Sequence, residues 1–315
     1  EMYEMLTQES KEQIAKEDFL KRHKNIYGGI GMNDMKTEIL AVEEESSLIN
    51  KISFNLAMNT DAGDIKFDGE VRLTKAKEKG YLINWSSSLI FPQLSSTDKV
   101  KVKTISSQRG EILDQNGKML AGQGEVSTVG IVPGKLPENK DEAIEQISEL
   151  LETTTEVINK NLSASWVKDD TFVPIKKVSK DATELKAKLI QIQGIKITTT
   201  KSRVYPLGEA AAHLVGYVQN ITAEELEANK DKGYTSNSVI GKAGLEKVYE
   251  ERLKGKDGIE IYIEDSEGKK KSTLAKIDVQ NGENIKLTID TNIQEKLYEQ
   301  LKENEGFFVV MEPNT

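Results

Sequence analysis

RGEILDQNGKMLA, residues 109–121, contains a strong signal for a tight β-hairpin. Asn116 and Gly117 both tolerate positive φ angles, and apolar residues flank the surrounding turn on either side. A second run, residues 203–217, reads RVYPLGEAAAHLVGY. It predicts an extended segment and a turn, followed by an Ala-rich helix that starts near Glu209. Neither run looks like an active site, so both are expected to have structural roles.

Arginine is rare in this chain, and both runs begin with one. Only five of the 43 basic residues are arginine, namely Arg22, Arg72, Arg109, Arg203 and Arg252. A planar guanidinium that stays charged suits a fixed, bidentate, partly buried contact better than a flexible ammonium does. We therefore expect Arg109 and Arg203 to hold one lobe of the protein against another, rather than to bind a ligand.

Four ordered runs resemble conserved motifs of the class B penicillin-binding proteins. Residues 109–121 resemble the first motif of the non-catalytic region of that family, and residues 203–217 resemble a later one. GKAGLEKVYEERLKG at 241–255 is similar to a third motif, and LTIDTNIQ at 287–294 to the segment that leads into the transpeptidase domain. WVKDDTFVP at 166–174 is closest to the low-affinity subgroup that includes the methicillin-resistance transpeptidase. Together these matches cover about residues 100–315.

The resemblance implies a set of structural residues between lobes. They are Arg109, Gly110, Asp114, Gly117, Arg203, Tyr205, Pro206, Gly208, His213, Gly216, Gly244 and Glu246. His213 is expected to be a packed, hydrogen-bonded core residue of the Ala-rich helix rather than a catalyst. The alternative is a groove for a muropeptide or a β-lactam at the lobe junction, lined by Ser202, Arg203, Arg109 and Asp257, but an interlobe salt bridge is the simpler interpretation.

Composition limits the classes of function. A chain of 315 residues with 37% hydrophobic and 30% charged residues is typical of a soluble globular protein with two or three domains. The net charge of -9 argues against a nucleic-acid partner, which usually requires a basic face. Absence of cysteine excludes disulfides and thiolate sites, and the only histidines, His23 and His213, are far apart in sequence. We therefore expect no metal and no cofactor.

Residues 1–97 are expected to form the first domain. A capping box at residues 10–13 predicts the start of a helical region that ends at Gly28 and Gly29. Alternating apolar residues then predict an antiparallel sheet with one covered face; its strands are residues 39–42, 52–58, 65–73 and 81–85, with turn signals at 61–64 and 79–80, and a solvated turn is expected at 43–45. This order resembles a cone-shaped, nuclear-transport-factor-like (NTF2-like) domain, which we expect to act as a spacer or docking domain.

Residues 98–283 are expected to form an elongated α+β lobe, similar to the pedestal or dimerisation domain of the resembled family. Short elements are predicted by periodicity and by a capping box at 222–225: strands at 126–132, 259–263 and 273–279, and helices at 143–151, 156–161, 182–191, 223–232 and 245–253. Residues 284–315 predict a strand at 285–289, a helix capped by residues 291–294 and a buried strand at 306–311. By resemblance, this last segment begins a truncated transpeptidase domain.

Catalytic residues are not expected in this chain. A penicillin-binding transpeptidase needs a serine with a lysine one helical turn away, followed by a KTG element. Ser-x-x-Lys occurs at 96–99, 165–168 and 266–269, but each string lies in a polar linker or a turn and none is followed by KTG. Gly28–Gly31 lacks the GK[ST] of a phosphate loop.

The resemblance implies a function for the parent protein. It would be a serine-type D,D-transpeptidase of peptidoglycan, inhibited by β-lactams through the absent domain, with a single membrane anchor upstream of residue 1 that holds this region outside the cytoplasm. Residues 1–315 would be a non-catalytic stalk that docks to peptidoglycan and cell-wall synthesis proteins. The alternative is a stand-alone interaction module, or a muropeptide- or β-lactam-sensing module, without an attached enzyme.

Overall fold

The chain folds into two compact α+β units. The computed structural model describes residues 1–76, 80–304, 306–307 and 309–311. The N-terminal unit comprises Glu1–Gln108 and Gly255–Asn281, and the central unit comprises Arg109–Lys254 and the chain from Gly282 onward. Residues 98–108 and 255–281 pack with residues 1–97, because the strands at 99–105, 258–264 and 270–277 form one sheet that contributes to the core of the N-terminal unit.

The N-terminal unit begins with short helices, η1 (Met2–Met5), α1 (Gln8–Gln13) and α2 (Lys16–Gly29). The predicted capping box at residues 10–13 is wrong, because Thr7 caps α1 and its Oγ1 accepts a hydrogen bond from Ser10 N at 3.3 Å. Ser10 is instead buried, and its hydroxyl accepts a hydrogen bond from Trp85 N at 2.9 Å. The predicted end of the helical region at Gly29 is confirmed.

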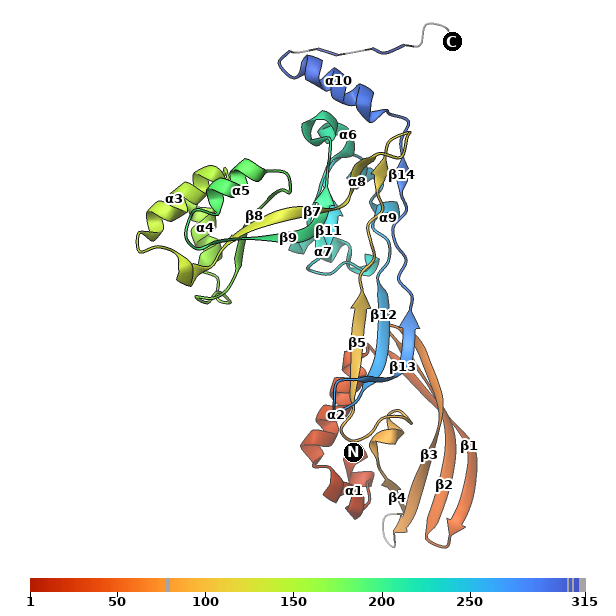
Figure 1. The fold of residues 1–315 in the computed structure, drawn as a ribbon. Coiled ribbons are helices and arrows are strands. Elements are labelled where there is room, and N and C mark those ends of the chain that lie inside the picture. Colours follow the sequence, from red (N-terminus) through yellow and green to blue (C-terminus); the bar gives the residue numbers. More distant parts are fainter. Residues whose placement is uncertain (77–79, 305, 308, 312–315) are drawn as a thin grey trace. The chain divides into compact units, whose positions relative to one another are not determined.

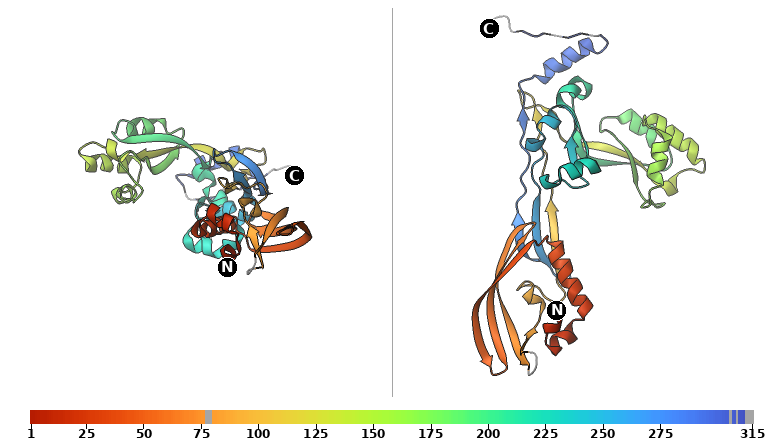
Figure 2. Two further views of the ribbon diagram at one scale, coloured as in Figure 1. Left: turned by 90° about the horizontal axis from the view of Figure 1, so that it is seen from below. Right: turned by 180° about the vertical axis from the view of Figure 1, so that it is seen from behind.

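A four-stranded antiparallel sheet follows, in the order β1-β2-β3-β4. Its strands are β1 (Asp34–Ser46), β2 (Ile49–Thr60), β3 (Gly63–Ala76) and β4 (Gly80–Asn84). The predicted alternation is confirmed in β2, where Phe54, Leu56 and Met58 are all buried. It is wrong for β1, in which every residue is exposed, so the predicted strand at 39–42 has no covered face. Residues 43–45, predicted as a turn, lie in β1 instead, and Lys79 of a predicted turn lies outside the described residues. Figure 2 shows the curved sheet with α1 and α2 along one side.

A second sheet completes the N-terminal unit, in the order β13-β12-β5. It consists of β5 (Lys99–Ile105), β12 (Gly258–Glu264) and β13 (Lys270–Ile277), and all of its pairings are antiparallel (Figure 1). Ile261 and Ile263 of β12 are fully buried in the same core as Phe54 and Leu56. The short η2 (Ser87–Leu89) precedes this core's Ile90 and Phe91.

The central unit is built on the predicted hairpin, which is confirmed. β6 (Ile112–Leu113) pairs antiparallel with β7 (Met119–Ile131), and Gly117 in the turn has a φ of 84°. The five-stranded sheet has the order β14-β6-β7-β8, with β9 also paired to β7. The added strands are β8 (Val173–Ser179), β9 (Ile195–Val204) and β14 (Ile285–Lys286), the last parallel to β6.

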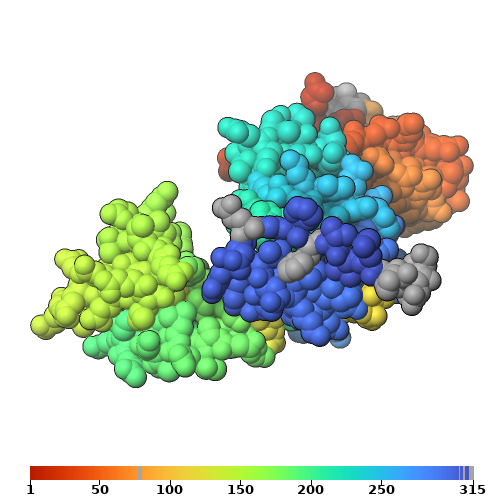
Figure 3. Space-filling view, turned by 90° about the horizontal axis from the view of Figure 1, so that it is seen from above, coloured from red at the N-terminus to blue at the C-terminus, as the bar shows by residue number. Residues whose placement is uncertain are grey.

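Helices cover one end of this sheet. They are α3 (Lys140–Leu150), α4 (Thr155–Leu162) and α5 (Thr183–Leu189), preceded by η3 (Pro133–Lys135), and all three predicted helices are confirmed. Ile147, Ile158 and Leu189 pack without exposure against Val129 and Ile131 of β7. Figure 3 shows this segment, in yellow-green, as a compact group of its own.

The rest of the central unit consists of short elements: η4 (Gly208–Ala211), α6 (Ala212–Val215), β10 (Val218–Asn220), α7 (Ala223–Ala228), η5 (Lys230–Lys232), β11 (Val239–Gly241), α8 (Gly244–Val248), α9 (Glu250–Leu253) and α10 (Thr291–Leu301). The predicted capping box of α7 is confirmed, with Thr222 and Glu225 in the two roles. The single helix predicted over 245–253 is broken at Tyr249, and α10 is capped by Asp290 rather than by Thr291.

The predicted strand at 306–311 is wrong for the residues that the structure describes. Phe307 and Val309 are 85% and 70% exposed and belong to no strand, because no strand among the described residues pairs with them. Phe308 lies outside the described residues. In the described part of the chain, none of the helices has the length and apolar composition needed to cross a membrane.

Candidate functional site

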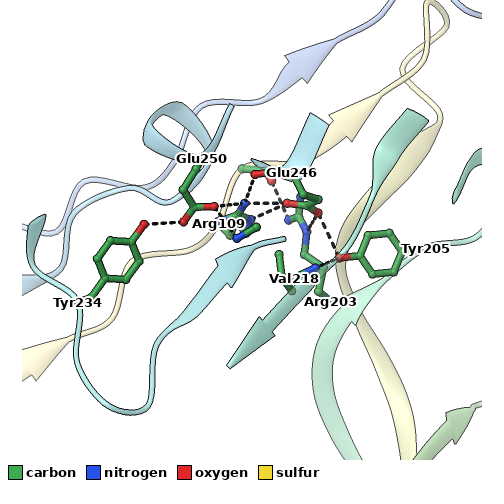
Figure 4. A network of polar contacts seen from close by, with 9 residues as sticks. Arg109, Arg203, Tyr205, Val218, Tyr234, Glu246 and Glu250 are labelled. Carbon is green, nitrogen blue, oxygen red and sulfur yellow. Dashed lines mark hydrogen bonds and ion pairs between the residues drawn. The ribbon is translucent and has the colours of Figure 1, made fainter. Parts of the chain in front are cut away.

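A buried carboxylate, that of Glu246 in α8, binds two arginines in the central unit (Figure 4). Its side chain is 0% exposed. Arg109 Nε donates to Oε2 at 2.8 Å, and Arg203 Nε donates to Oε1 at 2.6 Å. The two guanidiniums are only 10% and 7% exposed. These are short, charge-assisted hydrogen bonds, which are stronger than neutral ones.

Each partner comes from a different element. Arg109 precedes β6 and Arg203 lies near the end of β9, where it pairs with Gln123 of β7. Arg203 Nη1 also donates to Gly110 O at 2.7 Å, and Arg109 Nη2 donates to Glu246 O at 3.0 Å. The contacts therefore join the hairpin, β9 and α8. Both arginines belong to one unit, so the predicted clamp between lobes is a clamp within the central unit.

A second carboxylate balances the charge. Glu250 Oε2 accepts from Arg109 Nη2 at 2.6 Å and from Gly241 N at 2.9 Å, and its Oε1 accepts from the Tyr234 hydroxyl at 2.8 Å. Burial alone would raise the pKa of Glu250, but the hydrogen bond and positive charge of Arg109 hold it below its usual value. The network thus contains two carboxylates and two guanidiniums.

Tyr205 completes the network as a neutral donor. Its hydroxyl donates to Glu246 Oε1 at 3.3 Å and accepts from Val218 N at 2.9 Å. Burial, together with the neighbouring Glu246 charge, raises the pKa of Tyr205 to about 12. The hydroxyl therefore stays protonated at neutral pH. Such a balanced, hydrogen-bonded arrangement fixes geometry, and no group in it is poised to transfer a proton.

Two glycines allow α6 and α8 to approach at the backbone. Gly216 has a φ of 74°, and a Cβ added to it would lie 1.9 Å from Ala243 O. Gly244 has a φ of 56°, and a Cβ there would lie 2.6 Å from both Gly216 N and Leu214 O. Any larger side chain would push α8, and with it Glu246, away from the arginines.

Asp114 forms a second buried junction in the same unit. Its side chain is 0% exposed; Oδ1 accepts from the backbone N–H groups of Asn116 and Lys118, both at 2.8 Å. Oδ2 accepts from Thr291 N at 3.2 Å and from Thr291 Oγ1 at 3.0 Å. Although burial alone would raise the pKa of Asp114, these hydrogen bonds lower it to about 2. Asp114 thereby joins the hairpin turn to the start of α10.

Other predicted site residues lie outside these junctions. His213 is exposed, which corrects the prediction of a packed core residue: α6 is a single turn, and of its residues only Val215 is buried. Pro206 is exposed in the turn before η4, and Gly208 is the exposed first residue of η4. Gly110 is close-packed, because a Cβ there would lie 2.0 Å from Glu283 O.

The four residues of the alternative groove are divided between the units. Asp257 lies in the N-terminal unit, where its Oδ1 accepts from Ser107 N at 2.7 Å. Ser202 lies in the central unit, and its hydroxyl accepts from Lys177 Nζ at 3.2 Å. Arg109 and Arg203 make the contacts to Glu246 described above.

The catalytic candidates lie where the sequence predicts them. The serines of all three Ser-x-x-Lys strings, Ser96, Ser165 and Ser266, lie in bends or turns and not in helices. Among residues that the structure describes, no group of three or more His, Asp and Glu side chains is arranged to hold a metal ion.

Sequence reasoning missed Glu250 and Tyr234. The spacing of Glu246 and Glu250 was an available signal, since side chains four residues apart lie on the same face of a helix. The partners of that face could not be found from spacing, because Arg109 is 137 residues from Glu246.

Comparison with known protein families decides which family this is. Residues 104–287 match the penicillin-binding protein dimerisation domain, and residues 1–98 match the NTF2-like N-terminal transpeptidase domain. The chain belongs to the class B penicillin-binding proteins. The Glu246 network and the Asp114 junction thus lie mainly within the dimerisation domain, and the curved sheet β1–β4 lies within the NTF2-like domain.

Individual relatives agree with this assignment. Penicillin-binding protein 3 of Bacillus subtilis is 39% identical over 321 residues, which cover 100% of this chain and 48% of that protein. The peptidoglycan D,D-transpeptidase MrdA of Acinetobacter baumannii is 30% identical over 229 residues, which cover 71% of this chain and 34% of that protein. The chain therefore spans less than half the length of these relatives.

Among the similar solved structures is one of a penicillin-binding protein. It is a complex between penicillin-binding protein PBP2 and MreC from Helicobacter pylori, with 26% sequence identity and a TM-score of 0.41. The match covers 64% of this chain and 39% of that chain.

Proposed function

We propose that this chain is the non-catalytic, extracytoplasmic stalk and docking region of a membrane-anchored peptidoglycan D,D-transpeptidase. The observation that supports this most strongly is the buried Glu246 network in the dimerisation domain. Its carboxylates are engaged by protein groups from the hairpin, β9 and β11, so it serves to fix the positions of segments rather than to act on a substrate.

The relatives support the same proposal. The A. baumannii relative is named as a D,D-transpeptidase, and the match covers only 34% of its length. In this proposal the catalytic serine, and the acyl-enzyme that β-lactams form with it, belong to a part of the protein other than residues 1–315. The stalk carries that part and presents surfaces to peptidoglycan and cell-wall synthesis proteins.

The test compares two variants of the full-length protein in which this chain occurs. Glu246→Gln removes the buried charge, whereas Glu251→Gln alters a carboxylate that is 86% exposed and pairs only with Lys232, at 3.7 Å, among the residues described. We expect fluorescent penicillin to label both variants, because acylation takes place in another domain. We expect peptidoglycan cross-linking in cells to fall only for Glu246→Gln.

Two results would contradict the proposal. One is a natural protein that ends without any transpeptidase domain, which would favour a stand-alone interaction or sensing module. The other is full cross-linking activity of Glu246→Gln at normal protein levels, since a stalk with a disrupted junction should not support the enzyme.

A further inference from the structure

A groove of about 880 Å³ lies wholly within the N-terminal unit. It is lined by the end of α1, by α2, by the connection between β4 and β5 and by the start of β5. None of its residues belongs to the Glu246 network. Its size is within the range of sites that bind a small ligand or a short peptide.

One wall of the groove is an open strand edge. β5 is the last strand in the order β13-β12-β5, and in the described part of the chain it pairs only with β12. Its residues Lys99, Val100 and Lys101 line the groove. α2 packs against this sheet, because Ile26 of α2 lies in the same core as Ile261 and Ile263 of β12 (Figures 1 and 2). An unpaired edge next to a helix is the geometry in which an extended peptide adds to a sheet as a further strand.

The groove is cationic in a chain that is acidic overall. Lys21, Arg22, Lys99 and Lys101 line it, against Asp18 and Asp98. Asp98 is already satisfied, because its Oδ2 accepts from Ser95 N at 2.8 Å and from Lys271 Nζ at 2.9 Å. Lys101 lies 4.0 Å from Glu264. Lys21 and Lys99 form no ion pair with any residue that the structure describes, so their charges are open to a ligand.

Arg22 adds a charge that no carboxylate contacts. Its Nη2 donates to Ser95 O at 2.8 Å and its Nη1 to Ser96 O at 3.1 Å, both of them backbone carbonyls. Its Nε is buried without a hydrogen-bond partner among described residues, and so is Nε1 of Trp85, which also lines the groove. Burial lowers the pKa of Arg22, because the guanidinium loses contact with water and the charge of the nearby Asp98 does not fully offset that loss. The groove therefore favours a ligand that brings negative charge and hydrogen-bond acceptors.

We propose that this groove binds an acidic, extended segment of a partner protein, which pairs as an additional strand with β5. The backbone of the segment bonds to Lys99–Lys101, a span of about 10 Å at ~3.3 Å per residue. Its carboxylates face Lys21 and Lys99, and its apolar side chains contact Val100 and Trp85. This binding site goes beyond the stalk function and does not depend on it.

The experiment uses the 315-residue chain and a fluorescein-labelled hexapeptide of alternating Glu and Val with blocked ends. We expect fluorescence anisotropy to show binding that weakens as salt rises. The double variant Lys21→Glu and Lys99→Glu should weaken it by about tenfold or more, because like charges then face each other. The matched controls are Lys24→Glu on α2 and Lys103→Glu on β5, exposed lysines outside the groove, which should change affinity by less than about twofold.

Two further peptides separate strand addition from simple charge attraction. A Lys-Val hexapeptide should not bind, and a Glu-Val hexapeptide with N-methylated backbone amides should bind at least about tenfold more weakly, because it cannot donate to β5. The proposal is overturned if the Glu-Val peptide does not bind, if N-methylation has no effect, or if the control variants weaken binding as much as the groove variants do.

Discussion

Glu246→Gln is the substitution that probes the buried network most sharply. The glutamine keeps the size of the side chain and removes its charge. The amide has one acceptor oxygen where the carboxylate has two, so it cannot accept from both Arg109 and Arg203. Arg109 would keep the Glu250 carboxylate at 2.6 Å, whereas Arg203 would keep the Gly110 carbonyl but have no carboxylate partner among the described residues. A guanidinium that is 7% exposed would be left without a carboxylate.

The expected loss of folding stability in Glu246→Gln follows from the burial of the Glu246–Arg203 ion pair. Removing one partner of a buried ion pair typically destabilises a protein by about 3–5 kcal/mol. Glu250→Gln should cost less, about 1–3 kcal/mol, because Glu250 binds one arginine and is 13% exposed. The exposed Glu251→Gln should change stability by less than about 0.5 kcal/mol.

Hydrogen exchange followed by mass spectrometry resolves this effect within each unit. For a loss of 3–5 kcal/mol, the slowest amides of β7 should exchange faster by about two to four orders of magnitude. Amides of β2 provide an internal reference, because the N-terminal unit has a separate core. An acceleration of less than tenfold at β7, or an equal acceleration for Glu251→Gln, would refute the conclusion that Glu246 holds the central unit together.

Two further predictions concern the backbone and pH. Gly216→Ala should disrupt the central unit, because its Cβ would lie 1.9 Å from Ala243 O. The control Gly117→Ala meets open space and should cost only the ~1–2 kcal/mol of its left-handed backbone. Thermal melts of both variants followed by circular dichroism measure the difference, and equal melting temperatures would contradict it. The pKa of Asp114 is about 2 in the folded state, below the ~3.9 of an unfolded chain, so its contribution to stability is present above pH ~4 and is lost as the pH falls through about 2. Urea midpoints measured from pH 5 to pH 2 should therefore fall more steeply for the natural protein than for Asp114→Asn, and parallel slopes would exclude this role.

The parts of the fold that depend on neighbouring residues could be predicted from the sequence. The Asn116-Gly117 hairpin needs only its own turn residues, and α3 and α7 follow from periodicity and a capping box. The capping box at residues 10–13 failed because Thr7 occupies the capping position three residues earlier.

The parts of the fold that depend on residues distant in sequence could not be predicted. β5 pairs with β12 more than 150 residues away, and this pairing, together with the packing of β12 in the core of the N-terminal unit, groups residues 255–281 with residues 1–108. The scarcity of arginine pointed to Arg109 and Arg203, but nothing local identified Glu246 as the partner of both. His213 was misjudged because the Ala-rich run suggested a helix packed in the core, whereas α6 is a single turn in which only Val215 is buried.

The central claim is that these residues support a transpeptidase and carry out no acyl transfer themselves. The most direct measurement is the intact mass of the 315-residue chain after incubation with benzylpenicillin, with full-length penicillin-binding protein 3 of B. subtilis treated in parallel as the positive control. We predict an unchanged mass for this chain, because its Ser-x-x-Lys serines, Ser96, Ser165 and Ser266, lie in turns or bends without a helical lysine partner. A stable penicilloyl adduct on any serine of this chain would contradict the account.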